Sequence, residues 1–268
     1  MFLQLCVFAS FITSLCASAT FDITNTPLTV YSTPANNFYD PEVVISNKDF
    51  AVAFLYDATE HAILYSTLPK KSTAWSQAKI LITGANGGAR ACIDGQGFGA
   101  VCCPLQDGNV GVIRFEMTSK DIIYGEFHSL PSTGTASAPV VCVCGPNKQV
   151  LGWKTNNGTY YVGFSPKIGS FEWNILPSIS ANQGKAEDFC LVGNPSGDCV
   201  LIWNNATSSN YGQYYSQRVN VNSQSLEGAI ELPGAVPGKL YQYEGFASMS
   251  SSGDVLFSWT YGKDAKPL

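Results

Sequence analysis

Short apolar runs alternate with tight polar turns along most of the chain, as expected of antiparallel β-strands. One pair of runs recurs, and in each copy the two runs flank a turn such as SNKD, GPNK or NPSGD. The second run ends at Phe54, Cys102, Trp153, Trp203 and Trp259, which lie 48, 51, 50 and 56 residues apart. The pattern therefore predicts five β-hairpins, one roughly every fifty residues.

A third strand is predicted after each of the first four hairpins. A weaker fourth strand follows around Trp75, Tyr124, Trp173 and Ile230. Four antiparallel strands repeated at constant spacing are typical of propeller blades, so we expect an all-β, five-bladed β-propeller. The predicted units cover residues 40–87, 88–136, 137–185, 186–241 and 242–268, the last together with 20–39.

The two ends of this domain, residues 20–268, are expected to complete one another. The fifth unit stops soon after its second strand, and the segment before the first hairpin has no hairpin of its own. A ring closed by this segment leaves no unpaired sheet edge, although residues 20–32 could form one strand or two. A β-sandwich is the alternative, since its turns recur at a similar spacing, but it does not explain the repeat.

The first residues predict an export signal. Residues 2–15 are almost unbroken apolar, and Ala17, Ser18 and Ala19 form a small-residue pattern that signal peptidases cleave. The run is shorter than the roughly 20 residues that span a bilayer. We therefore expect a signal peptide over residues 1–19 and a secreted, periplasmic or cell-surface protein without an integral membrane segment after cleavage.

The composition of the chain excludes some classes of function. Only 13% of residues are charged and 45% are hydrophobic, which provides for a large core. The net charge of -5 lacks the basic surplus that binds a phosphate backbone, so no nucleic-acid partner is expected. The sequence has no H-E-x-x-H, paired C-x-x-C or glycine-rich strand-to-helix turn, and we expect no cofactor.

The repeat, with a hairpin ending in Trp or another bulky residue and a further Trp later in the unit, resembles repeats of secreted bacterial β-propellers. These are distantly related to sialidase and glycosidase propellers, and the resemblance covers residues 40–268. The S-x-D-x-G-x-T-W box of sialidases is absent, and the chain has three arginines, Arg90, Arg114 and Arg218. The resemblance therefore implies the fold and not sialidase activity.

In a propeller, the starts of the innermost strands ring one mouth of the central channel. The residues at these positions are Asp40, Glu42, Arg90, Ser137, Glu187, Asp188 and Glu244. They predict several carboxylates opposed by one guanidinium, a mouth suited to sugar hydroxyls or a cation. We assign ligand binding to Glu42, Arg90 and Glu187.

The same mouth would allow a glycoside hydrolase, because two carboxyl groups, one acid and one base, suffice for hydrolysis. Asp40-Pro41 is similar to the Asp-Pro that opens the first blade of five-bladed arabinanases and xylosidases, which implies a base at Asp40. The segment QYEGF is similar to their acid-bearing Glu-Gly, which implies an acid at Glu244, and Asp188 would tune a neighbour's pKa. The sequence departs from that family, whose acid lies on a middle blade and whose second-blade Asp has no counterpart here.

Seven cysteines follow the signal peptide, an odd number. Two disulfides across hairpins are candidates, Cys92 with Cys102 or Cys103 and Cys190 with Cys199, and free core thiols are the alternative. The pair Cys142 and Cys144 would suit a metal only with further ligands. An unpaired thiol would also permit a disulfide-linked envelope component.

The remaining candidates are histidines and aromatic residues. His61 and His128, the two histidines, are expected on the surface and away from the channel. Exposed aromatic rings could stack on sugars, but packing between blades is the expected role of Tyr160, Tyr161, Trp173, Tyr211, Tyr214 and Tyr215.

Together these observations predict an exported, non-enzymatic β-propeller binding or scaffold module with a protein or carbohydrate ligand at the channel mouth. The alternative is a glycoside hydrolase that uses Asp40 and Glu244, supported by Asp188.

Overall fold

A computed structural model describes residues 38–47, 50–165, 172–177, 179–180, 189–205, 213–232 and 241–262. The predicted signal peptide, residues 1–19, lies outside this part of the chain, as do nearly all of the predicted closing segment and the pair Glu187 and Asp188. Within it, no helix is long and apolar enough to cross a membrane.

The first two sheets each contain four antiparallel strands in chain order. The first comprises β1 (Phe38–Ile45), β2 (Ala51–Asp57), β3 (Ala62–Leu68) and β4 (Lys79–Thr83). The second comprises β5 (Arg90–Ile93), β6 (Phe98–Pro104), β7 (Val110–Met117) and β8 (Ile122–Leu130).

In the next two sheets the outer position is divided between two short strands that pair with the same neighbour. The third sheet comprises β9 (Ala136–Val143), β10 (Gln149–Thr155), β11 (Thr159–Phe164), β12 (Asn174–Ile175) and β13 (Ile179–Ser180). The fourth comprises β14 (Phe189–Gly193), β15 (Cys199–Asn205), β16 (Gln213–Asn220), β17 (Ser225–Leu226) and β18 (Ile230–Glu231). The fifth pairs β19 (Tyr241–Met249) with β20 (Val255–Gly262).

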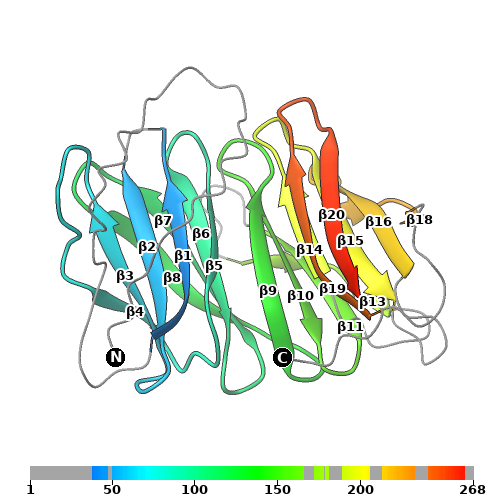
Figure 1. Cartoon of the computed structure of the whole chain (residues 1–268), viewed down its shortest axis with the longest axis horizontal. Helices are drawn as coiled ribbons and strands as arrows, with labels where there is room; N and C mark the ends of the chain where they lie inside the picture. The colour runs from blue at the N-terminus through cyan, green and yellow to red at the C-terminus, as the bar shows by residue number, and fades with distance from the viewer. Residues whose placement is uncertain are drawn as a thin grey trace.

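The sheets follow one another in chain order, and their innermost strands β1, β5, β9, β14 and β19 are successive neighbours (Figure 1). A separate apolar core fills the space between each pair of successive sheets. Within one strand, alternate residues therefore enter different cores: Leu151 and Trp153 of β10 face the second sheet, whereas Val150 faces the fourth. These four cores exclude a two-layer sandwich, and the five all-β antiparallel sheets fit five blades.

The five predicted hairpins are present, and each turns through a five-residue loop closed by a hydrogen bond: 46–50, 94–98, 144–148, 194–198 and 250–254. In the second of these, Phe98 is also the first residue of β6. In every loop the amide of the first residue donates to the carbonyl of the last, at 2.9 Å in the third and 3.0 Å in the fourth. When the five units are aligned on this loop, Trp153, Trp203 and Trp259 occupy the same position in the last three sheets. The residues at that position in the first two sheets are Leu55 and Cys103. The sequence alignment on Phe54 and Cys102 was therefore wrong by one residue, because it matched bulky side chains and not the loop.

Neighbouring hairpin loops are also bonded to one another. The Asn147 amide donates to Asp94 Oδ2 at 2.9 Å, which joins the second and third loops. The Gly145 amide donates to the Asn194 carbonyl at 3.0 Å, which joins the third and fourth. Asn194 Nδ2 then donates to the Ser250 carbonyl at 3.0 Å, so a chain of hydrogen bonds fixes four sheets at one end.

We expect Asn194→Ala to lower the free energy of unfolding by about 1–3 kcal/mol, because the buried amide of Asn194 bonds half-buried partners in two loops, which lose those hydrogen bonds. Asn194 is buried, and its Oδ1 also accepts the Asp198 amide at 2.9 Å. Urea denaturation measures the loss. Asn222→Ala, which removes an exposed amide that accepts from Lys148, is the matched control and should stay within about 0.5 kcal/mol of the native chain. Equal losses in the two variants would contradict this role of Asn194.

Candidate functional site

The start of β1 contains a β-bulge. Tyr39 pairs with Tyr56 and Glu42 pairs with Phe54, so Asp40 and Pro41 together oppose one residue of β2. Asp40 has a φ of 47°, a left-handed conformation that Asp tolerates better than most residues, and Pro41 has no amide to offer the ladder. The bulge thus follows from the Asp-Pro sequence, and it redirects side chains at the end of the strand.

The same bulge recurs in the innermost strands of the third and fifth sheets. Ala138 and Pro139 oppose Trp153, and Glu244 and Gly245 oppose Trp259. Both residues that the sequence proposes as an acid–base pair, Asp40 and Glu244, therefore lie at bulges, on the first and the last innermost strand. For Glu244 the structure describes the backbone position.

An ion pair joins the first two innermost strands at their starts. Arg90 Nη1 lies 3.6 Å from Glu42 Oε2, and the two side chains are 51% and 27% exposed. Burial raises the pKa of Glu42, while the Arg90 guanidinium and a hydrogen bond from the Ala91 amide oppose this shift. The sequence prediction that these two residues meet at the mouth is consistent with this geometry.

Asp40 lies against the segment that leads into β5. A Cβ atom built on Gly88 would fall 2.3 Å from the Asp40 Cβ, so the close approach requires glycine. Tyr39, next in the chain, is 54% exposed. The mouth between the first two sheets therefore presents an exposed carboxylate, a guanidinium with its carboxylate partner and an open aromatic ring, which are groups that hydrogen-bond and stack on sugars.

The remaining residues predicted at the mouth are Ser137, Glu187 and Asp188. Ser137 lies in β9 and is half-buried. Glu187 and Asp188 lie outside the described residues, so the predicted contribution of the fourth sheet remains a prediction.

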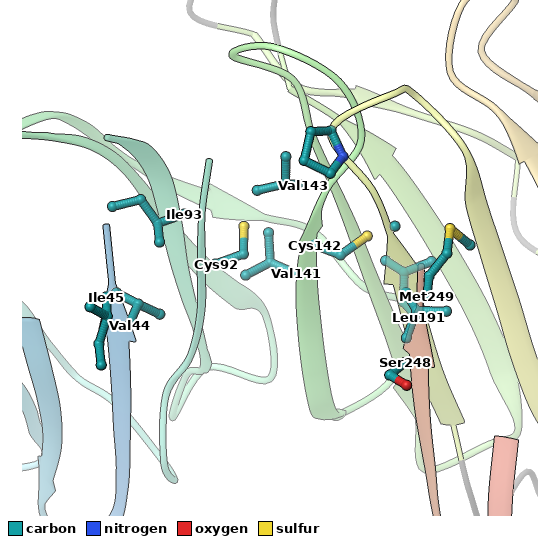
Figure 2. A pocket seen from close by; sticks show the side chains of 13 residues that line it. Val44, Ile45, Cys92, Ile93, Val141, Cys142, Val143, Leu191, Ser248 and Met249 are labelled. Atoms are coloured by element: carbon teal, nitrogen blue, oxygen red, sulfur yellow. The ribbon is translucent and has the colours of Figure 1, made fainter. Parts of the chain in front are cut away.

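The opposite ends of the innermost strands are apolar, which the sequence prediction missed. A cavity of about 410 Å³ lies at the hairpin ends of all five innermost strands. Figure 2 shows side chains of the first two sheets facing those of the other three across it. Its lining is Val44, Ile45, Cys92, Ile93, Val141, Cys142, Val143, Leu191, Val192, Gly193, Pro195, Ser248 and Met249. The apolar residues just before each hairpin loop were the available signal.

Three cysteines meet beside this cavity. Cys142 Sγ lies 3.4 Å from Cys144 Sγ and 3.8 Å from Cys199 Sγ. Thiol hydrogen bonds from the two neighbours lower the pKa of Cys144 to about 5, whereas burial raises the pKa of Cys142 and Cys199. Within the described part of the chain, this is the one group of three or more side chains that could hold a metal ion. The sequence analysis assigned no metal site: it noted that Cys142 and Cys144 would need further ligands, and it missed Cys199, which comes from the next sheet.

The predicted disulfides across hairpins are wrong. The strand register places Ala100 opposite Cys92, Cys102 opposite Arg90 and Ile202 opposite Cys190. None of the seven cysteines in the described part of the chain forms a disulfide. Free core thiols, the alternative, match the buried positions of Cys102 and Cys103.

Histidines and aromatic residues take the expected positions where they are described. His61 precedes β3, and His128 lies on the outer strand β8. Four of the aromatic residues are buried: Tyr160, Tyr161, Trp173 and Tyr214. Tyr161 stacks on Trp153 with centroids 4.9 Å apart, and Tyr160 stacks on Phe189 of the next sheet at 5.5 Å. Tyr215 is half-buried against Trp203, and Tyr211 lies outside the described residues.

Comparisons with known proteins bear on the fold. No protein-family model and no curated protein matches the chain. An α-L-arabinanase of Penicillium chrysogenum, solved with arabinobiose, has a TM-score of 0.50 and 10% identity, covering 88% of this chain and 82% of its own. A mutant of the Aleuria aurantia lectin, solved with α-methyl-L-fucoside, has a TM-score of 0.50 and 11% identity over 85% and 77%. A lectin of Burkholderia pseudomallei has a TM-score of 0.56 and 13% identity over 88% and 71%. These similarities are to β-propeller folds.

We expect the carboxyl pKa of Glu42, followed by ¹³C NMR, to lie above the ordinary value of 4.5 and to rise further in Arg90→Met, because the guanidinium stabilises the carboxylate. Between the unfolded and the higher folded pKa the native state binds more protons, so the Glu42 contribution to the free energy of unfolding falls as pH rises through that window. Glu42→Gln should abolish this dependence, whereas Glu126→Gln on the exposed face of β8 should leave it unchanged. A lower Glu42 pKa in Arg90→Met would contradict the analysis.

Proposed function

We propose that this chain is a non-enzymatic β-propeller binding module whose ligand is a carbohydrate held at the mouth where the innermost strands start. The observation that carries the proposal is the half-exposed Arg90, paired with Glu42, together with the exposed ring of Tyr39 on the same strand as Glu42. An oriented guanidinium and carboxylate offer donors and acceptors to adjacent hydroxyls, and an exposed tyrosine offers a stacking face.

Similar folds support the choice of ligand class. The arabinanase holds arabinobiose and the Aleuria lectin holds a methyl fucoside, so folds similar to this one accommodate sugars in those proteins. The opposite, apolar end of this channel offers few polar groups to a sugar. The mouth at the strand starts is therefore the better carbohydrate surface.

The proposal includes ring closure and export. The fifth sheet has two described strands where the others have at least four, which leaves β20 an edge for a further strand. We infer that residues 20–39 supply it, since an open edge of this length is prone to aggregate. Residues 1–19 would direct the chain out of the cytoplasm.

One specific observation keeps the hydrolase as a second candidate. Asp40 and Glu244 occupy equivalent bulges on the first and last innermost strands, which closure of the ring would bring together. Carboxyl groups about 5–10 Å apart could act as a base and an acid.

We expect the full chain to bind at least one glycan class on an array, and Arg90→Met and Tyr39→Ala to weaken that binding about tenfold or more, because each removes a direct contact. The matched controls lie on outer strands: Lys79→Met removes a cation paired with Asp121, and Tyr124→Ala removes an exposed tyrosine. Both should bind as the native chain does.

Chromogenic glycosides separate the two candidates. If the chain is a non-enzymatic binding module, it will hydrolyse none of these glycosides. Turnover that Asp40→Asn and Glu244→Gln abolish would establish the hydrolase instead. Glycan binding equally affected by the outer-strand controls, or no glycan binding at all, would overturn the carbohydrate site at the mouth and favour a protein ligand.

A further inference from the structure

The cysteine cluster is assembled from two sheets by backbone geometry. Cys142 is the penultimate residue of β9, the innermost strand of the third sheet, Cys144 opens the hairpin loop that follows, and Cys199 is the first residue of β15 in the fourth sheet. The Gly145 amide, adjacent to Cys144, donates to the carbonyl of Asn194 in the neighbouring loop. The hydrogen bond between loops therefore holds the three sulfurs in register.

Glycine at the next innermost strand makes room for the sulfurs. A Cβ atom on Gly193 would fall 2.5 Å from Cys144 Sγ and 3.1 Å from Cys142 Sγ. The backbone of β14 therefore approaches the cluster more closely than any other residue type would permit. The three side chains are buried, so their sulfurs are enclosed by protein on most sides.

The spacing of the sulfurs suits a common metal ion. Two thiolates bound to Zn²⁺ at about 2.3 Å in tetrahedral geometry lie about 3.8 Å apart. The observed separations from Cys142 are 3.8 Å, which equals this value, and 3.4 Å, which is slightly shorter, and all three sulfurs lie within 4.8 Å of one another. A small rotation of the side chains would place one ion equidistant from the three.

We propose that Cys142, Cys144 and Cys199 bind one thiophilic metal ion, Zn²⁺ or Cu⁺, in the wall of the central cavity. Three thiolates and no hard oxygen ligand in the group select soft or borderline metals over Mg²⁺ and Ca²⁺. Cu⁺ accepts three sulfurs alone, whereas Zn²⁺ would take a fourth ligand from the cavity side.

The central cavity gives the ion a route to the site. Cys142 is one of the cavity-lining residues, and in Figure 2 its sulfur points toward β14 and away from Cys92. Cys144 and Cys199 lie behind it, almost without exposure. An ion that enters the cavity would therefore meet Cys142 first and then be enclosed by the other two thiolates.

Metal binding by the full chain tests the proposal. Metal-free protein, kept reduced and anaerobic, is dialysed against Zn²⁺ alone or Cu⁺ alone, with Cys6 and Cys16 changed to serine throughout so that they do not contribute. We expect about one ion per chain for at least one of the metals. Cys142→Ser, Cys144→Ser and Cys199→Ser should each weaken binding about tenfold or more, and Cys190→Ser, a nearby thiol outside the cluster, should not.

X-ray absorption on the loaded parent chain does not depend on the folding of any variant. A first shell of three sulfur atoms at about 2.3 Å is the expected result. A shell dominated by nitrogen or oxygen, no binding of either ion, or binding that survives all three cluster substitutions would overturn the site. So would a disulfide between two of these cysteines that, once reduced, leaves the chain unable to bind either ion.

Discussion

The five-residue loop at the tip of each inner hairpin is the constraint on which the rest of the structure depends. Its closing hydrogen bond is repeated in all five sheets, and side-chain or backbone bonds link the second loop to the third, the third to the fourth and the fourth to the fifth. These bonds fix four of the five loops relative to one another, so the innermost strands of the second to fifth sheets are held together at this end. Separate apolar cores then fill the space between successive sheets.

This arrangement makes the two ends of the innermost strands chemically different. At the loop end, side chains from five strands converge on an apolar cavity, with a buried cysteine cluster in its wall. At the strand starts, β-bulges interrupt regular pairing, and charged residues such as Glu42 and Arg90 meet across neighbouring sheets. The proposed sugar site and the proposed metal site therefore lie at opposite ends and depend on different features of the same strands.

The sequence predicted what is local and repeated. Strand alternation, turn residues and the spacing of bulky residues were enough for five hairpins and four-stranded antiparallel sheets. The sequence analysis failed where the result depends on strand register. The predicted disulfides of Cys92 and Cys190 were wrong, because a shift of one or two residues changes which side chains face each other. The contact of Cys199 with Cys142 depends on packing between sheets, which no local pattern encodes. The position of Asp40 and Glu42 at a strand start could be predicted because the hairpin pattern is local, whereas their role in a site stays a prediction.

Closure of the ring is the central claim, since a complete mouth requires all five strand starts around one channel. Hydrogen exchange along β20 in the intact chain, resolved residue by residue by NMR, tests it most directly. In an antiparallel pair, alternate amides of an edge strand point away from its partner. If another segment pairs with β20, consecutive amides from Val255 to Gly262 will be protected. Protection of alternate amides alone, those that bond to β19, would show an open edge and contradict the account.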